Sequence, residues 1–128
     1  METYSDRLVG AKIDFYSGKV SEQLAKYLSP QESGNKSLVR FAKLTDKKGR
    51  GLLVAGHCIN VSALCYTPSE LEEARHDFEL PPVTKTVLRI SLSQMGIGGD
   101  DTWGAPTLDE YLLKGEGTLK FDYVIKGI

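Results

Sequence analysis

The sequence predicts an all-β, antiparallel fold with one short helix. Short segments rich in β-branched and aromatic residues recur between Gly, Pro, Asn and Asp clusters, which is typical of strands joined by tight turns. A single capping signal, Thr67-Pro68-Ser69-Glu70, predicts the helix. The length of 128 residues suits one domain with one core.

Seven segments have the apolar pattern of strands. In chain order they are residues 8–16, 37–45, 51–57, 61–66, 83–92, 109–113 and 118–126. In the last segment Leu119, Phe121, Tyr123 and Ile125 alternate with neighbours that are mostly polar. This alternation predicts a strand with one buried face on an antiparallel sheet. Lys47, Lys48 and Arg50, together with Asp46 and Gly49, predict a solvated hairpin turn.

The predicted helix has a defined start and a defined end. Thr67 offers the N-cap hydroxyl, Pro68 occupies the first helical position, and Glu70 completes a capping box. Leu71, Ala74 and Phe78 then form an apolar stripe before Pro81-Pro82 ends the segment. A second segment, residues 21–28, has apolar residues at helical spacing but also fits an extended connection.

The charge pattern excludes two classes of partner. Sixteen basic and seventeen acidic residues give a net charge of −1, and they are interspersed along the chain. Nucleic acids and anionic membrane surfaces require clustered Lys and Arg, so we expect neither as a partner. No apolar run reaches the ~20 residues of a membrane-spanning helix, and no secretory signal is visible.

The cysteines and histidines predict structural roles. Cys58 and Cys65 are the only cysteines, their spacing matches no metal motif, and we expect buried free thiols. His57 is expected to pack on a strand. His76 follows Glu72 by four residues on the predicted helix, so the two could form a hydrogen bond or a metal pair. No third ligand is evident, which favours a structural interaction and no metal site.

The loop at residues 94–104 is the best candidate for a binding site. It holds four glycines, two adjacent aspartates and Trp103, the only tryptophan. A large aromatic delivered by a Gly-rich turn is typical of ligand contact, although a core position would be the alternative. Asp100 and Asp101 are too close in sequence for the ~5–9.5 Å separation of glycosidase carboxylates. We therefore expect them to cap backbone N–H groups.

Four segments in order carry a resemblance to a known family. They are residues 2–7, 27–35, 71–76 with Leu80, and 94–104, whose Gly-Gly-Asp-Asp-Thr-Trp sequence is the most specific. Together they resemble the C-terminal domain, or small chain, of the retaining β-galactosidases of glycoside hydrolase family 2. Thr102 departs from the family, in which serine is common before the tryptophan. The resemblance spans residues 2–104.

The resemblance implies a partial antiparallel β-sandwich of the galactose-mutarotase-like type. It also implies that residues 1–128 are a single fragment of that domain and that the catalytic glutamates lie on an absent (β/α)₈ barrel. Met1 is then expected to be an engineered or mis-annotated start. The chain alone is expected to be inactive, with no catalytic residue and no metal ligand, and any Mg²⁺ or Na⁺ of the parent would bind elsewhere. Residues 21–28 are expected to be extended.

The implied function is that of the C-terminal portion of a retaining β-galactosidase, which hydrolyses terminal β-D-galactosyl residues. Trp103 would contact the substrate, and Gly98, Gly99, Asp100 and Asp101 would orient its loop. The implied partners are the parent's catalytic barrel and a galactoside, with self-association of the fragment. The parent would be cytoplasmic or periplasmic.

The alternative is a freestanding, non-catalytic carbohydrate-binding or interaction module that uses the concave face of the sheet. Glu32 and Arg40 bear on this alternative, because they could line a carbohydrate groove. We favour for them a buried polar network that holds a long connection onto the sheet.

Overall fold

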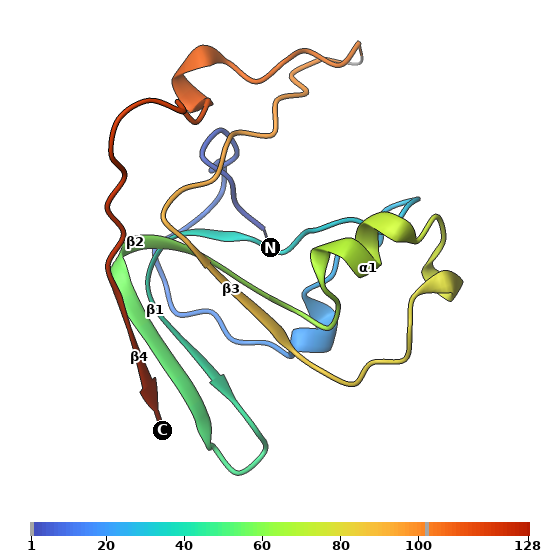
Figure 1. Ribbon diagram of the computed structural model, residues 1–128, viewed down its shortest axis with the longest axis vertical. Helices are drawn as coiled ribbons and strands as arrows, with labels where there is room; N and C mark the ends of the chain where they lie inside the picture. Colours follow the sequence, from blue (N-terminus) through green and yellow to red (C-terminus); the bar gives the residue numbers. More distant parts are fainter. Residues whose placement is uncertain (1, 102) are drawn as a thin grey trace.

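The computed structural model describes residues 2–101 and 103–128. These residues form one four-stranded antiparallel sheet, one short α-helix and short 3₁₀ turns (Figure 1). The strands are β1 (Lys36–Thr45), β2 (Gly51–Leu64), β3 (Val87–Ser91) and β4 (Tyr123–Gly127), the helix is α1 (Pro68–Glu73), and the turns are η1 (Val20–Glu22), η2 (Asp77–Glu79) and η3 (Asp109–Tyr111). The all-β class is confirmed, and the described residues supply one sheet layer.

Strand β2 is the centre of the sheet. It pairs with β1 along one edge, while β4 and β3 follow one another along the other edge, opposite residues 52–56 and 60–64 respectively. Between these two stretches the β1 register shifts, and Cys58 adopts a φ of 54°. This β-bulge bends β2 and lets one strand serve two partners. The predicted strands 51–57 and 61–66 are therefore two halves of one strand.

The core is small and lies around the bulge. Val54, Ile59 and Val61 are buried in one cluster. Residues that are half-buried against this cluster are Val39, Ala42, Leu88, Ile90 and Phe121. Outside this cluster, Leu71 of α1 is completely buried and Ala74 lies nearly so.

The capping box of α1 is confirmed. The Thr67 hydroxyl accepts a hydrogen bond from the Glu70 backbone N–H at 3.2 Å, and the Glu70 carboxylate accepts one from the Thr67 N–H at 2.7 Å. Hydrogen bonding from Lys85, followed by the Thr67 donors, lowers the pKa of Glu70 to about 2. The helix nevertheless ends at Glu73. Phe78 therefore lies in η2 and is 83% exposed, so its predicted place in the apolar stripe is wrong.

Two of the predicted strands are absent, and others are longer than the observed ones. Residues 8–16 form no strand, because Gly10 adopts a φ of 78° and breaks the extended backbone. Residues 109–113 hold the turn η3 instead, closed by the Tyr111 N–H donating to the Leu108 carbonyl at 2.9 Å. Of residues 118–126, only those from Tyr123 onward pair with β2.

Strand β4 also lacks the buried face that its alternation predicts. Every residue of β4 is exposed, as is Leu119, and only Phe121 is half-buried. The described residues place no second layer over this strand. The strand predicted at residues 83–92 is also shorter than expected. Strand β3 begins only at Val87, because its partner there, Leu64, is the last residue of β2.

The hairpin turn after β1 is confirmed, with Asp46 accepting the Lys48 and Arg50 N–H groups at 2.8 and 3.0 Å. Cys58 and Cys65 are free but half-buried rather than buried. Residues 21 and 22 belong to η1, and residues 23–28 follow it as an irregular segment without an α-helix. None of the helices in the described part of the chain has the length and apolar character that crossing a membrane requires.

The chain exposes far more surface than a compact monomer of its mass. Its accessible surface is 9809 Å², whereas a folded monomer of 14.1 kDa has about 6,700 Å² by the usual scaling with mass. Large apolar side chains are among the exposed ones: Val9, Ile13, Phe15, Leu28 and Leu119 are all more than 70% exposed. Apolar surface on this scale is typical of a site that contacts other protein.

We expect the chain to self-associate as its concentration rises. The exposed apolar side chains and the exposed edge strand β4 favour association over the dispersed monomer. Sedimentation equilibrium over a concentration series should give a mass that increases with protein concentration. A mass of 14.1 kDa across the whole series would contradict this expectation.

Candidate functional site

The loop that carries Trp103 begins after β3 and projects beyond the end of the sheet (Figure 1). The Trp103 side chain is 92% exposed, so it takes no part in the core of this chain. Asp101 shapes the tip of the loop: its Oδ1 accepts the N–H groups of Trp103 and Ala105 at 2.8 and 3.2 Å. The departure from the family at Thr102 lies outside the described residues.

Two glycines let the loop turn beneath its tip. Gly98 and Gly99 have φ values of 67° and 75°, which other residues rarely adopt. A Cβ on Gly98 would also lie 2.9 Å from the Thr107 backbone nitrogen. The Gly99 N–H donates to the Ala105 carbonyl at 2.9 Å and closes the tip. The two sides of the loop are therefore joined at Gly99 and Ala105.

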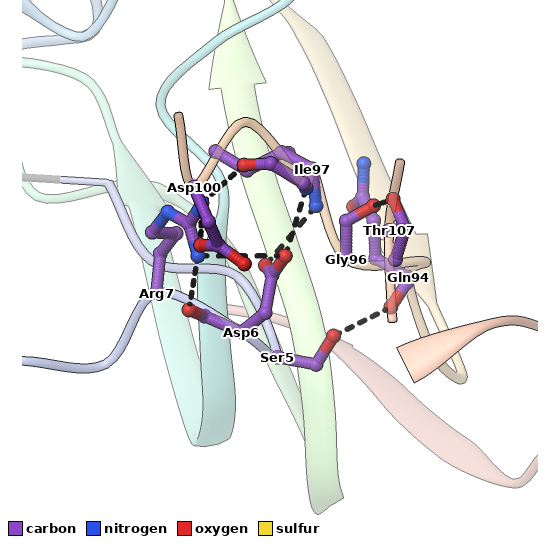
Figure 2. Close-up of polar contacts among 9 residues, drawn as sticks. Ser5, Asp6, Arg7, Gln94, Gly96, Ile97, Asp100 and Thr107 are labelled. Atoms are coloured by element: carbon purple, nitrogen blue, oxygen red, sulfur yellow. Dashed lines mark hydrogen bonds and ion pairs between the residues drawn. The ribbon is translucent and has the colours of Figure 1, made fainter. Parts of the chain in front are cut away.

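The base of the loop rests on a tight turn near the N-terminus, residues 4–7 (Figure 2). Asp6 accepts the N–H groups of Ile97 and Gly98, one on each carboxylate oxygen, at 3.0 and 2.9 Å. The Asp6 side chain is only 6% exposed. Burial alone would raise the pKa of Asp6, but the two backbone donors and Arg7 hold it below its ordinary value.

Arg7 connects the same turn to the loop at two further points. Its Nη2 donates to the Gly98 carbonyl and to Asp100 Oδ1, the latter at 2.9 Å. Its Nη1 donates to the Asp6 carbonyl at 2.8 Å, which orients the guanidinium (Figure 2). Asp100 thus forms an ion pair with Arg7 rather than the expected backbone cap.

The two sides of the loop are tied to the molecule as well. Ser5 donates to the Gln94 carbonyl at 3.3 Å, and Thr107 donates to the Gly96 carbonyl at 2.8 Å (Figure 2). Gly96 is buried, and a Cβ there would lie 2.6 Å from Asp6 Oδ2 and 2.8 Å from the Tyr111 Cβ. Position 96 therefore requires glycine for the close approach of the turn and the loop.

A second polar network anchors the N-terminal turn to the start of β1. Glu2 accepts the Tyr27 hydroxyl and the Gly34 N–H, each at 2.6 Å. The buried Asn35 side chain donates to the Thr3 carbonyl at 2.9 Å and to Asn60 Oδ1 of β2 at 3.2 Å. These contacts fix the turn relative to the sheet.

Tyr4, between the two networks, is 8% exposed. Burial, and next the charge of Glu2, raise the pKa of Tyr4 to about 12. Beside it lies a polar cavity of about 10 Å³, the space of one water molecule. This cavity is too small for a sugar.

Glu32 and Arg40 do not act together. Glu32 forms an ion pair with Arg89 of β3, which attaches the connection before β1 to the far side of the sheet. Arg40 is exposed on β1 and makes no ion pair in the described residues. An open groove of about 580 Å³ lies between the 29–32 segment and α1, with Arg75 and Arg89 at its walls.

His76 does not meet Glu72, because α1 ends before His76 is reached. Its ring stacks on Phe78, with centroids 5.2 Å apart, and its Nδ1 lies 3.4 Å from Glu79 Oε1. His57 is exposed rather than packed. Within residues 2–101 and 103–128, no three His, Cys, Asp or Glu side chains are grouped as metal ligands are.

Four predicted loop residues support the backbone that carries Trp103. Gly98 and Gly99 form its turn, Asp100 pairs with Arg7, and Asp101 accepts the Trp103 N–H. Sequence reasoning missed the two residues that hold the loop from outside, Asp6 and Arg7. It also missed the close approach at Gly96 and the anchoring of the N-terminal turn by Glu2. The contacts of Asp6 and Arg7 with the loop span about ninety positions of the chain, so no local pattern reveals them. The one available signal is that residues 2–7 and 94–104 both belong to the segments that carry the family resemblance.

Comparison with known proteins gives a consistent result. The family model described as "Beta galactosidase small chain" matches residues 1–125. A β-galactosidase of Halalkalibacterium halodurans is 43% identical over 99% of this chain and 13% of its own length. β-Galactosidases of Priestia megaterium and Streptococcus thermophilus are 45% and 38% identical over 88% and 98% of the chain. The chain spans only about an eighth of the length of these relatives.

Proposed function

This chain belongs to the β-galactosidase small chain family, and on that basis we propose that it forms the C-terminal part of a retaining β-galactosidase, within a sandwich domain completed by the rest of that enzyme. In this role Trp103 contacts the galactosyl group of the substrate. The proposal rests on one observation: Trp103 is 92% exposed, and it lies on a loop whose base is held by hydrogen bonds to Asp6 and Arg7. An exposed side chain on a supported loop suits ligand contact.

The chemistry of the indole supports a sugar as the ligand. One face of galactose is rich in C–H groups and offers a flat apolar surface, which matches the indole ring. The ring N–H is still free to donate to a hydroxyl or to water. The two carboxylates of this loop have other roles than glycosidase catalysis, since Asp100 is engaged by Arg7 and Asp101 by the loop backbone.

The catalytic carboxylates in this proposal come from the parent's barrel, which is the main partner of the chain. The excess total surface and the exposed large apolar side chains support such a partner, because a compact monomer of this mass exposes less surface. Any Mg²⁺ or Na⁺ that hydrolysis needs is bound by the parent, outside this chain. Terminal β-D-galactosides are the substrates.

A hybrid enzyme tests the proposal. We expect the H. halodurans β-galactosidase, with its matching 13% replaced by this chain, to hydrolyse a chromogenic β-galactoside. The purified chain alone should give no hydrolysis above buffer, because it lacks both the nucleophile and the acid. Deleting the matching segment of the H. halodurans enzyme, as a control, should abolish its activity.

Two results would contradict the proposal. Turnover by the isolated chain after removal of host enzyme would show that it carries its own catalytic groups. A folded hybrid without activity, together with galactose binding by the isolated chain in calorimetry, would favour the freestanding carbohydrate-binding module.

A further inference from the structure

We propose that Asp6 and Arg7 are positioning residues that set the place of Trp103 in the substrate site. The two residues, with the loop atoms they hold, are called here the 6–7 clamp. The proposal rests on the proposed function of Trp103 and adds the device that orients it. Neither residue is expected to touch the sugar.

The Asp6 contacts restrain the backbone where the loop leaves the body of the protein. One carboxylate holds two successive N–H groups, those of Ile97 and Gly98, within 3.0 Å. Two hydrogen bonds donated to one buried carboxylate fix both the position and the direction of that peptide segment. Gly96, directly before it, leaves no room for even a methyl group against Asp6. The base of the loop is thereby locked.

The Arg7 contacts restrain the next stretch, nearer to the tip. One guanidinium nitrogen, Nη2, donates both to the Gly98 carbonyl and to Asp100 Oδ1. Asp101 follows directly and holds the N–H of Trp103 at 2.8 Å. Figure 2 shows the polar contacts from the N-terminal turn as far as Asp100. The peptide link from Asp100 to Asp101 and the hydrogen bond of Asp101 extend this restraint to the backbone of Trp103.

Geometry of this kind matters because a catalytic site tolerates little displacement. An error of about 1 Å in a binding group can cost about 100-fold in rate. Trp103 has no packing of its own to hold it, since its side chain is 92% exposed. Its position must then come from the loop backbone, and the loop backbone is set by the 6–7 clamp.

The first test uses this chain by itself and measures the loop directly. In Asp6→Asn one acceptor oxygen becomes an NH₂ donor that faces a backbone N–H, so one of the two hydrogen bonds is lost. We expect amide hydrogen exchange at Ile97 and Gly98 to rise at least tenfold, and the fluorescence anisotropy of Trp103, the only tryptophan, to fall. Exchange in β2 should not change. Asp122→Asn, at an exposed aspartate, is the matched control.

The second test uses the hybrid enzyme and a double-mutant cycle. Asp6→Asn and Arg7→Lys should each lower kcat/KM about tenfold or more. If they act through Trp103, adding either change to Trp103→Ala should have little further effect. Arg40→Lys, at an exposed arginine on β1, should leave kcat/KM unchanged. Arg7→Lys also provides a second variant should Asp6→Asn fail to fold.

The outcomes separate the clamp from the proposed function. Unchanged exchange at Ile97 and Gly98 would overturn the clamp. Losses in kcat/KM that add fully to that of Trp103→Ala would also overturn it, because the residues would then act by another route. If Trp103→Ala left kcat/KM of an active hybrid unchanged, Trp103 would not contact the sugar. The proposed effect of the 6–7 clamp on catalysis would then be overturned as well.

Discussion

Replacing Trp103 with alanine in the hybrid enzyme is expected to lower kcat/KM for a β-galactoside by about 10- to 100-fold. Burying a large apolar side chain against a partner contributes about 1.5–3 kcal/mol, and each 1.4 kcal/mol corresponds to about tenfold. The free energy of unfolding of the chain should change by less than about 0.5 kcal/mol, because the indole is 92% exposed. Steady-state kinetics and urea denaturation provide the two measurements.

Two further variants sharpen this result. Trp103→Phe retains a flat aromatic face and should recover part of the lost kcat/KM. Ile97→Ala removes an exposed apolar side chain from the same loop while leaving its N–H to Asp6 in place, so it should have little effect. A marked loss of stability in Trp103→Ala with unchanged kinetics would assign Trp103 a structural role instead.

The parts of the fold that are coded locally could be predicted from the sequence. The capping box at Thr67 and the hairpin turn at Asp46 each depend on residues within four positions of one another, so their patterns are complete in a short window. Strand β1 was predicted to within one residue because its alternation coincides with its pairing. The bulge at Cys58 could not be predicted, since its left-handed backbone is imposed by the β1 register.

The errors have a common physical origin. Segments 8–16 and 118–126 carry apolar patterns that in a compact domain would mark buried strands, yet here Ile13 and Leu119 are exposed. An apolar pattern predicts that a segment is buried, but it does not identify the part of the protein that covers the segment. In a chain that covers about an eighth of its relatives, this agrees with the proposal that the rest of the parent covers these segments.

The candidate site was predictable in part for the same reason. Gly-rich composition and a lone tryptophan identify the loop from its own sequence. The residues that hold it, Asp6 and Arg7, are distant in the chain, and an Asp-Arg pair is by itself common on protein surfaces. Only the tertiary structure shows that Asp6 faces Ile97 and Gly98.

Replacing Ile59 with alanine should be the most destabilising single truncation of the core. Ile59 is 1% exposed and packs in one cluster with Val54 and Val61 at the bend of β2. Removing a buried isoleucine side chain to the β-carbon costs about 2–5 kcal/mol, because apolar contacts are lost and a cavity remains. Against a total stability of about 5–15 kcal/mol for a folded domain, the urea midpoint should fall strongly.

The matched control is Ile13→Ala, the same chemical change at a side chain that is 92% exposed. It should change the free energy of unfolding by no more than about 0.5 kcal/mol. Both variants are best measured at low protein concentration, where self-association does not add to the apparent stability. Equal urea midpoints for the two variants would show that the bend of β2 is not the core of the chain. A large loss in Ile13→Ala alone would place the core at the N-terminal segment instead.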